Sequence, residues 1–561
     1  MCTTIERHVA SDLTMTSMRR LTLSLAFAIV LSALVATSSA QEENAHNPMI
    51  WADVPDVAPL RVADQYYMSS TTMFYYPGVP IMQSSDLVNW NIVGYVDYQV
   101  PTEDELQLLN GKHAYGRGTW ASSLRFHNGQ FYLAVFSGTT GYTYIYSSPT
   151  VDGEWKMRKF KPMCHDCSLF FDKDDTPYLI YGNGNLRLTE LKKDLTGFQP
   201  NGIDEVIVRN AGAVAGGRIG LNAEGSQIFE RNGKYYLCNI TWPQGDMRTE
   251  IVHVADSIRG PYTGSVLFKD RGIAQGSLLE CSDGSWAAIF FRDAGAVGRI
   301  PYLMPVKWDN DVPIVGVDGK APETLNVPRD AKPLGNIVHS DEFQRDDALL
   351  QRLAQNAQKD EPEYPRDALP LAWQWNHYPD MKNWSLHERP GWLRLRTSRV
   401  DQNLQQTRNI LTQRVFGPTC YAQIKLDAAN MLEGDRAGLS LFQRKYGCVE
   451  VEKRQNKLYV VQREAVLQQR LEEDQVKVNE EIELESGVQT LYFKAECDFQ
   501  RQADFARFFW SVDGKQWRSI GADLKMVYTL PHFTGYRFAL YNQATESVGG
   551  YVDFDYFRID N

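Results

Sequence analysis

The stretch N-G-K-Y-Y-L-C-N-I, Asn232 to Ile240, joins a turn dipeptide to two tyrosines and a run of β-prone residues. Asn-Gly before such a run indicates a β-hairpin, because both residues tolerate the positive φ that a two-residue hairpin turn requires. Four other stretches repeat this order of turn, aromatic and apolar residues. They are A-D-Q-Y-Y-M-S-S-T from Ala63, N-G-Q-F-Y-L-A-V-F from Asn128, D-D-T-P-Y-L-I-Y from Asp174 and D-G-S-W-A-A-I-F-F from Asp283.

The five copies lie about 45 to 65 residues apart, which is close to the length of one propeller blade. We therefore predict an all-β fold in which residues 41–335 form a five-bladed β-propeller. An irregular β-sandwich is the alternative, since short strands at regular spacing are typical of that architecture too.

A second unit is predicted over residues 336–561. Its segments W-L-R-L-R-T, T-L-Y-F-K-A and Y-V-D-F-D-Y-F-R-I alternate in the manner of half-buried strands and predict a concanavalin-like β-sandwich. The charged segment 344–367 is interpreted as a surface insertion with room for a short helix. Trp373, Trp375 and Trp384 are either a sugar-stacking face or residues of the core and of an interdomain contact.

The chain has 561 residues and a formal net charge of −11, with lysine and arginine scattered along it. That pattern gives no electrostatic footprint for nucleic acid or an anionic membrane, so a neutral partner is expected.

At the N-terminus, Arg19 and Arg20 precede an apolar run that ends in T-S-S-A. This pattern predicts a signal peptide over residues 1–40, cleaved near Ala40, and a secreted, extracellular or periplasmic protein. A membrane anchor is the alternative.

The sequence C-H-D-C, Cys164 to Cys167, raises the alternatives of a zinc site, a disulfide or two buried thiols. Without the leader, seven cysteines remain and no second C-x-x-C is present. A structural zinc site needs four ligands, so zinc is disfavoured, while the other two alternatives stay open.

Three acids precede apolar strands at similar positions in different predicted blades: Asp56, Asp166 and Glu224. The first strands of propeller blades converge on a central channel, so residues at their starts are candidates for one site. Taken singly, each acid has a simpler interpretation as a cap, a turn residue or a surface carboxylate.

Long ordered motifs surround these acids, including P-G-V-P-I-M-Q-S-S-D-L-V-N-W, G-T-W-A-S-S-L-R-F, H-D-C-S-L-F-F-D, E-G-S-Q-I-F-E-R-N-G-K-Y-Y-L and G-A-V-G-R-I-P-Y-L. They resemble glycoside hydrolase family 43. The C-terminal motifs A-W-Q-W-N-H-Y-P-D and R-N-I-L-T-Q-R-V-F-G-P resemble the β-sandwich that accompanies β-xylosidases and arabinofuranosidases of that family.

The resemblance implies that Asp56 is a general base, Glu224 a general acid and Asp166 a third carboxylate that modulates the pKa of the acid and orients it. Inverting glycosidases use such a pair, one carboxyl to activate water and one to protonate the leaving oxygen. The resemblance also implies that Trp120 forms a wall of the sugar pocket and that Arg299 donates to a sugar hydroxyl. Core packing for Trp120 and a structural ion pair for Arg299 are the alternatives.

The chain departs from the family pattern at three places. The base lies in V-P-D-V-A instead of H-P-D-P-S, and Asp166 precedes Cys167 instead of proline. Gln275 replaces a histidine that helps hold a calcium ion or water cluster on the propeller axis. The resemblance implies no required cofactor and no assigned metal ligand, and it leaves open a structural calcium near Gln275, whose amide is also a candidate for substrate binding.

Together these features predict a secreted, exo-acting, inverting glycoside hydrolase. Its expected products are α-L-arabinofuranosyl or β-D-xylosyl units from plant hemicellulose such as arabinoxylan or arabinan, with arabinofuranosidase action preferred. The alternatives are a non-catalytic carbohydrate-binding propeller and another specificity on the same machinery, such as β-xylosidase or galactosidase action.

Overall fold

The structure is a computed structural model that describes residues 44–328, 334–470 and 474–561. The predicted signal peptide, residues 1–40, lies outside these ranges. Within them, no helix combines the length and the apolar character that crossing a bilayer requires.

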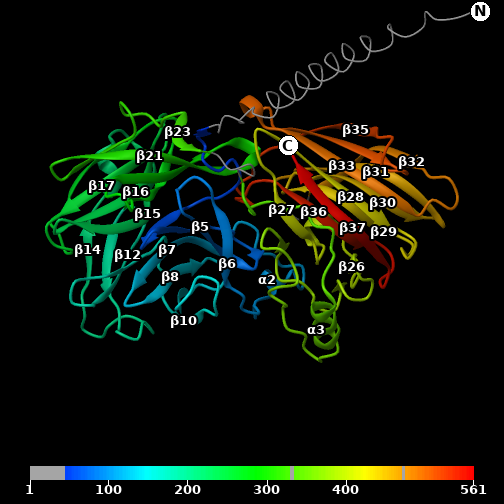
Figure 1. Cartoon of the computed structure of the whole chain (residues 1–561), viewed down its shortest axis with the longest axis horizontal. Helices are drawn as coiled ribbons and strands as arrows, with labels where there is room; N and C mark the ends of the chain where they lie inside the picture. The colour runs from blue at the N-terminus through cyan, green and yellow to red at the C-terminus, as the bar shows by residue number, and fades with distance from the viewer. Residues whose placement is uncertain (1–43, 329–333, 471–473) are drawn as a thin grey trace, which may run out of the picture. The chain divides into compact units, whose positions relative to one another are not determined.

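Five four-stranded antiparallel sheets follow one another along the chain, so the predicted five-bladed propeller is confirmed (Figure 1). Blade 1 contains β2 (Ala58–Val62), β3 (Gln65–Ser69), β5 (Gly78–Ser84) and β6 (Asn91–Asp97). Blade 2 contains β7 (Thr119–His127), β8 (Gln130–Ser137), β9 (Thr143–Ser148) and β10 (Lys156–Phe160). Blade 3 contains β11 (Ser168–Phe171), β12 (Pro177–Tyr181), β13 (Leu186–Glu190) and β14 (Asp204–Val208). Blade 4 contains β15 (Ile219–Arg231), β16 (Lys234–Pro243), β17 (Thr249–Ala255) and β18 (Thr263–Phe268), and blade 5 contains β19 (Ala274–Glu280), β20 (Trp286–Asp293), β21 (Arg299–Asp309) and β22 (Val312–Val315).

Each copy of the sequence repeat supplies the second strand of a blade: β3, β8, β12, β16 or β20. The turn residues before it close the hairpin with the first strand. Asn128 and Asn232 both have positive φ, as do the glycines that follow them, which is the geometry that the Asn-Gly pairs predict. The first strands contact one another in a closed ring, β2 to β7, β11, β15, β19 and back to β2.

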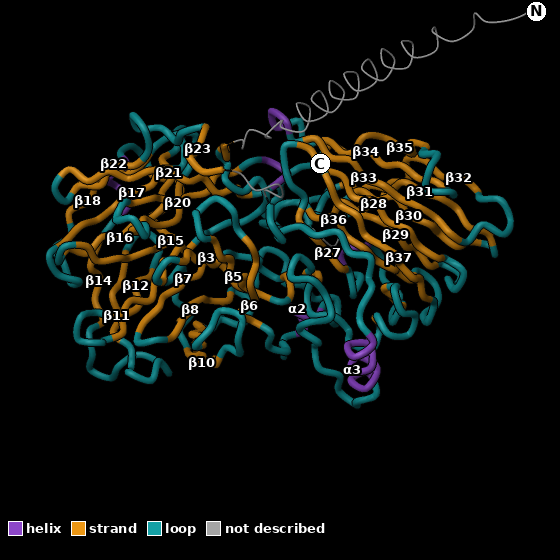
Figure 2. The backbone as a smooth tube through the Cα atoms, in the orientation of Figure 1, coloured by secondary structure: helices purple, strands orange, loops and turns teal. Residues whose placement is uncertain are grey.

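The C-terminal part is a sandwich of two antiparallel sheets (Figure 2). The eight-stranded sheet has the order β32 (Gln475–Glu483), β31 (Lys457–Val466), β30 (Gly447–Arg454), β29 (Asp435–Phe442), β36 (Arg537–Ala544), β27 (Leu411–Arg414), β24 (Gln374–Asn376) and β4 (Tyr75–Tyr76). The seven-stranded sheet has the order β25 (Trp384–Ser385), β26 (Leu393–Arg396), β37 (Tyr551–Asp560), β28 (Thr419–Asp427), β33 (Thr490–Asp498), β34 (Phe505–Ser511) and β35 (Arg518–Lys525).

In the described part of the chain, two helices and several short elements lie outside these sheets. They are α2 (Asp104–Gln107), α3 (Asp347–Ala357), η1 (Ala211–Ala215), η2 (Gly295–Val297), η3 (Leu404–Gln406), η5 (Gln500–Gln502), β1 (Asn44–His46) and β23 (Thr324–Pro328). Helix α3 lies within the predicted charged insertion. The Asp346 carboxylate caps it by accepting a hydrogen bond from the Leu349 amide at 2.8 Å.

Strand β4 joins the propeller to the sandwich, because it lies between β3 and β5 in sequence but pairs with β24. In that pair Trp375 faces Tyr76. A second junction forms where the Tyr536 amide donates to the carbonyl of Ala296 at 2.9 Å. Loops of the sandwich are thereby held against the propeller face that carries the candidate site.

The three tryptophans that begin the sandwich are buried: Trp373 is 2% exposed, Trp375 0% and Trp384 7%. The Trp373 indole donates to Asp341 at 3.1 Å, and the Trp375 and Trp384 rings pack 5.1 Å apart. These residues therefore belong to the core and the interdomain contact, and they do not form a sugar-stacking face.

Candidate active site

The propeller brings residues from five blades to the inner ends of its first strands. Asp56 and Asp166 each lie two residues before a first strand, and Glu224, Trp120 and Gln275 lie within β15, β7 and β19. Asp56, Asp166 and Gln275 share a positive φ of 53°, 48° and 61°, so one backbone conformation recurs at the same position in three blades. Because the first strands form a closed ring, residues far apart in sequence converge here.

Asp56 forms a buried ion pair with Arg299. The Arg299 Nη1 donates to Asp56 Oδ1 at 2.9 Å, and the two side chains are 3% and 6% exposed. Burial raises the pKa of Asp56 above its usual range, and the Arg299 guanidinium opposes that rise. Arg299 therefore forms the structural ion pair that the sequence offered as the alternative. Its donation to a sugar hydroxyl stays a prediction.

Glu224 is held through one of its two carboxylate oxygens. Its Oε2 lies 3.0 Å from His165 Nε2 and accepts a hydrogen bond from Asn183 Nδ2 at 2.6 Å. Among the described residues none bonds to Oε1, and the side chain is 19% exposed. One oxygen is therefore fixed by the protein, and the other is free to meet a ligand.

Asp166 lies beneath Glu224, where its Oδ2 accepts a hydrogen bond from the Gly225 amide at 3.0 Å. Burial raises the pKa of Asp166 to about 7; His165 opposes this rise, whereas the negative charges of Glu224 and Asp56 add to it. This is how closely spaced carboxyls come to share protons, because two adjacent negative charges are costly in a dry site.

His165 spans the two acids, with Nε2 also 3.7 Å from Asp166 Oδ2. Burial lowers its pKa, but the hydrogen bond to Glu224 and the nearby charges of both acids outweigh burial, so the pKa is raised overall. An imidazolium between two carboxylates reduces their mutual repulsion. The sequence analysis singled out Asp166 but overlooked His165 beside it, and it overlooked Asn183 too. The sequence did offer a signal for both residues: His165 is next to Asp166, and Asn183 lies in the turn after β12.

The ligand atoms of His165, Asp166 and Glu224 lie within 4.8 Å of one another and are the kind that bind metals. A metal requires deprotonated ligands, whereas the raised pKa values of His165 and Asp166 favour their protonated forms near neutral pH. This cluster fits a shared-proton network better than a metal centre.

The surroundings of Gln275 do not fit the calcium ion that the family resemblance left open. The Gln275 backbone N–H donates to one oxygen of the buried Glu250 at 2.7 Å, and the other Glu250 oxygen has no partner among the described residues. Burial raises the pKa of Glu250 well above its usual range, which disfavours the charged carboxylate. Calcium takes about six to eight oxygen ligands, with carboxylates prominent among them. The Gln275 side chain instead packs against Gly225, beside Asp166.

Several buried donors next to the acids have no partner among the described residues: Trp120 Nε1, Arg299 Nε and the Tyr528 hydroxyl. Tyr528 is close enough for Arg299 and Asp56 to influence its pKa, which burial raises. Unpaired buried donors are costly unless a ligand or water satisfies them. Their arrangement around the carboxyls suits a ligand rich in hydroxyl groups.

The sandwich contributes a second aromatic residue, Phe533, to the same site. Its ring lies 5.6 Å from that of Trp120 and 4.6 Å from the Arg299 guanidinium, and its carbonyl accepts from Arg299 Nη2 at 3.3 Å. Sequence reasoning identified Trp120 but missed Tyr528 and Phe533, because nothing local marks a loop of the second domain as part of a propeller site.

The cysteines that flank the acid cluster are free. Cys164 and Cys167 are buried thiols that pack with Ala134, Leu169 and Leu179 in an apolar cluster. The sequence left two alternatives open for this pair. The two residues are buried thiols and are not joined by a disulfide.

Two family models match the chain. Residues 45–313 match glycosyl hydrolases family 43, and residues 361–560 match the beta xylosidase C-terminal concanavalin A-like domain. Together they cover the propeller and the sandwich in the order in which the fold presents them.

Individual relatives agree with these matches. The chain is 26% identical to a β-xylosidase of Formosa agariphila over 92% of this chain and 90% of that protein. It is 26% identical to a non-reducing end α-L-arabinofuranosidase of Bacteroides ovatus, over 73% of this chain and 76% of the relative. The solved structure of a bifunctional GH43-CE protein from Bacteroides eggerthii has a TM-score of 0.86 and 50% identity over 93% of this chain, which spans 64% of that protein.

Proposed function

Because the chain belongs to glycosyl hydrolases family 43, we propose that it is an exo-acting, inverting enzyme that releases terminal α-L-arabinofuranosyl or β-D-xylosyl units from plant hemicellulose such as arabinoxylan or arabinan. Its glycoside hydrolase activity follows from the family and from relatives that are β-xylosidases and arabinofuranosidases. What we propose beyond that activity is that the enzyme cleaves terminal bonds, that it releases these sugars and that it inverts the anomeric configuration.

One observation carries the proposal: the two reacting carboxyls have opposite surroundings. Asp56 is paired with the permanent cation of Arg299, which favours its charged form. Glu224 lies in a cluster with a second acid, Asp166, and with His165, whose Nε2 is 3.0 Å from Glu224 Oε2. A single-displacement glycosidase needs this asymmetry, because one carboxyl must accept a proton while the other delivers one.

The proposed reaction uses these residues in one step. Asp56 takes a proton from a water molecule as the water oxygen bonds to the anomeric carbon. The bond from that carbon to the leaving oxygen breaks, and Glu224 gives its proton to the leaving oxygen. His165 and Asn183 hold Glu224 through Oε2, and Asp166 accepts from the adjacent Gly225 amide, which leaves Oε1 to face the leaving group. Trp120 and Arg299 are proposed to contact the sugar.

The sandwich loop supports exo action. Phe533 packs against Trp120 with the ring centroids 5.6 Å apart and brings the sandwich loop to the edge of the site, so the arrangement suits a terminal unit better than the middle of a long chain. The Bacteroides ovatus relative is likewise a non-reducing end α-L-arabinofuranosidase. Between the two sugars we prefer arabinofuranosyl, on the P-G-V-P-I-M and A-Q-G motifs. We also propose that the mature protein is exported, on the basis of the leader sequence at residues 1–40.

Initial rates on aryl α-L-arabinofuranoside and aryl β-D-xyloside test the proposal, with Glu224→Gln as the inactive comparison. We expect kcat to fall about 10²- to 10⁴-fold in that variant, as for loss of a general acid, with sugar affinity retained. Glu230→Gln, an exposed glutamate on the same strand β15, is the matched control and should retain full activity.

Proton NMR of the first product formed reports the stereochemistry. Inversion predicts that an aryl β-D-xyloside yields α-xylose first. Retention of configuration would overturn the single-displacement step, and binding of arabino-xylo-oligosaccharides without any cleavage would favour a non-catalytic carbohydrate-binding role.

A further inference from the structure

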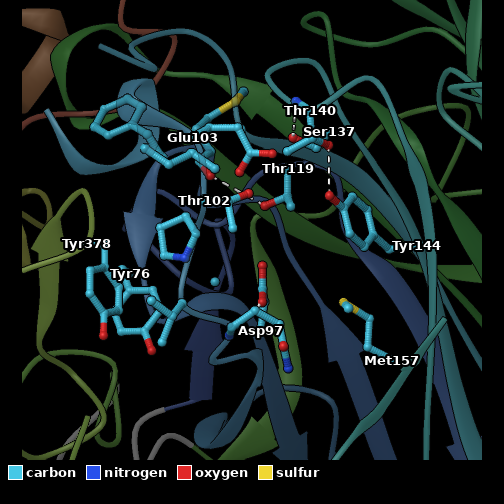
Figure 3. Close-up of a pocket in the computed structure, with 18 of the residues that line it drawn as sticks. Tyr76, Asp97, Thr102, Glu103, Thr119, Ser137, Thr140, Tyr144, Met157 and Tyr378 are labelled. Atoms are coloured by element: carbon cyan, nitrogen blue, oxygen red, sulfur yellow. Dashed lines mark hydrogen bonds between the residues drawn. The ribbon is translucent and has the colours of Figure 1, made fainter. Parts of the chain in front are cut away.

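A second cavity opens away from the acid cluster, between blades 1 and 2 (Figure 3). Its volume is about 160 Å³, which gives room for one sugar ring and not for an oligosaccharide. Its walls come from the β3–β5 connection, the segment from Asp97 to Leu106, and strands β7 to β10. None of Asp56, Asp166 and Glu224 lines it, so it is distinct from the candidate active site.

The Asp97 carboxylate points into this cavity from the end of β6 (Figure 3). It accepts a hydrogen bond from the Gln99 amide at 3.0 Å and one from the Tyr146 hydroxyl. No lysine or arginine within the described ranges forms an ion pair with it. A carboxylate offers about four acceptor positions, so Asp97 retains capacity for two hydroxyl donors.

The charge state of Asp97 suits that use. Burial raises its pKa to about 6, and the hydrogen bonds from Gln99 and Tyr146 oppose the rise. Asp97 is therefore mostly ionised at pH 7. Glu103 and Lys159 are the other charged residues that line the cavity, and an anionic ligand is disfavoured beside two carboxylates.

The remaining walls combine apolar surface with hydroxyl groups, as sugar sites do. Tyr144 and Met157 face the cavity on one side, and Tyr76 and Tyr378 lie on the other (Figure 3). The Tyr144 hydroxyl donates to Thr140 Oγ1 at 2.8 Å. The side chains of Thr119 and Ser137 add further hydroxyls to the lining.

Thr119 and Trp120 are consecutive on β7, where the pairing of that strand with β8 is irregular. Trp120 lies on the candidate active site and Thr119 on the second cavity. A single strand therefore separates the two sites.

We propose that this cavity is a second, non-catalytic sugar site, in which Asp97 accepts hydroxyl groups of one neutral pentosyl unit that packs against Tyr144. The choice of a pentose rests on the proposed function, whereas the site itself rests on the cavity and its lining. The unit held here differs from the one cleaved and belongs to a neighbouring branch or to released product.

Native mass spectrometry of the full chain counts bound sugars directly. The Glu224→Gln background prevents turnover, and methyl β-D-xylopyranoside and methyl α-L-arabinofuranoside are the probes. We expect up to two sugars per chain. Adding Asp97→Asn should weaken one of the two binding events about tenfold or more, because a charge-assisted hydrogen bond is lost. Glu154→Gln, an exposed acid in the β9–β10 connection of the neighbouring blade 2 and outside the cavity, is the control.

A second variant keeps the test valid if Asp97→Asn folds poorly. Thr102 is exposed at the cavity rim, so Thr102→Trp should block the opening without disturbing the core and should remove the same binding event. Two sugars bound equally in both variants would overturn the proposal, and so would a single sugar whose binding neither variant changes. Calcium chloride alone, bound in an Asp97-dependent manner without any sugar, would also overturn it. If instead the acid cluster does not bind sugar, one sugar should bind per chain, and Asp97→Asn should remove it.

Discussion

Nε2 of His165 lies 3.0 Å from Oε2 of Glu224 and thereby connects the proposed acid to a second ionisable group. The same nitrogen is 3.7 Å from Asp166. These contacts raise the pKa of His165 above its usual range, which favours the charged form of the ring. The site thus places one imidazole between two carboxyls, with Asp56 paired separately to Arg299.

Replacing His165 with glutamine tests this relationship. Glutamine retains a hydrogen-bond donor for Glu224 but removes the cation that opposes the raised pKa of Asp166. We expect kcat to fall about 10- to 100-fold, as for loss of a positioning contact. The limb of the pH profile of kcat/KM that reports Asp166 should move to higher pH.

The pH profile distinguishes this role from a purely structural one. A uniform loss of activity at every pH, with both limbs unchanged, would contradict the electrostatic role. His127→Gln is the control, because His127 stacks on Phe171 at the outer part of blades 2 and 3 and should leave the profile unaltered.

Asp166 should make folding stability pH-dependent. Its pKa is about 7 in the folded protein and about 4 in an unfolded chain. The folded state therefore binds the proton more tightly, and the associated stability is present below about pH 4 and lost as the pH rises through 7. The loss is on the order of a few kcal/mol.

Asp166→Asn removes this dependence. The melting temperature of the variant relative to the parent protein should rise between pH 5 and pH 8. Thermal unfolding at both pH values measures it, and a constant difference across the range would show that the pKa of Asp166 is not raised in the folded protein.

The buried pair of Asp56 and Arg299 should be strongly coupled. Arg299→Gln leaves the Asp56 carboxylate buried without its cation, so we expect destabilisation of about 3 to 5 kcal/mol. Adding Asp56→Asn removes the uncompensated charge and should recover part of the loss. Urea denaturation of the two single variants and the double variant gives the coupling energy, and strictly additive effects would contradict the pairing.

Much of the site could be predicted because it repeats. Asp56 and Asp166 precede first strands and Glu224 lies within one, and the aromatic repeat marks the strand that follows each of them. Repetition gives the position of a residue in its blade, but it does not give the contacts of its side chain. The bond from His165 to Glu224 depends on two blades meeting, so no local pattern predicts it.

The contribution of the second domain could not be predicted for a related reason. Arg299 and Phe533 are 234 residues apart, and the Phe533 loop has no periodic pattern. Likewise, whether Trp375 is exposed depends on β4, a strand supplied by the propeller. Burial of that kind is decided by tertiary pairing and not by the sequence around the residue.

The Tyr528–Phe533 loop gives the last prediction, which concerns substrate choice. Tyr528→Phe removes a buried hydroxyl that has no protein partner. If that hydroxyl donates to the sugar, KM for aryl pentosides should rise about 10-fold with a smaller change in kcat. Phe533→Ala removes the ring that packs against Trp120 and widens the site beside that tryptophan.

The two substitutions should therefore have different effects on activity. Phe533→Ala is expected to increase the rate on long arabinoxylan chains relative to short aryl glycosides, because the loop no longer blocks a continuing chain. Rates on both substrates for the two variants measure this ratio. Phe505→Ala, an exposed phenylalanine on β34 of the sandwich, is the control. Equal losses on both substrates in Phe533→Ala would mean that the loop supports the sugar without selecting for chain ends.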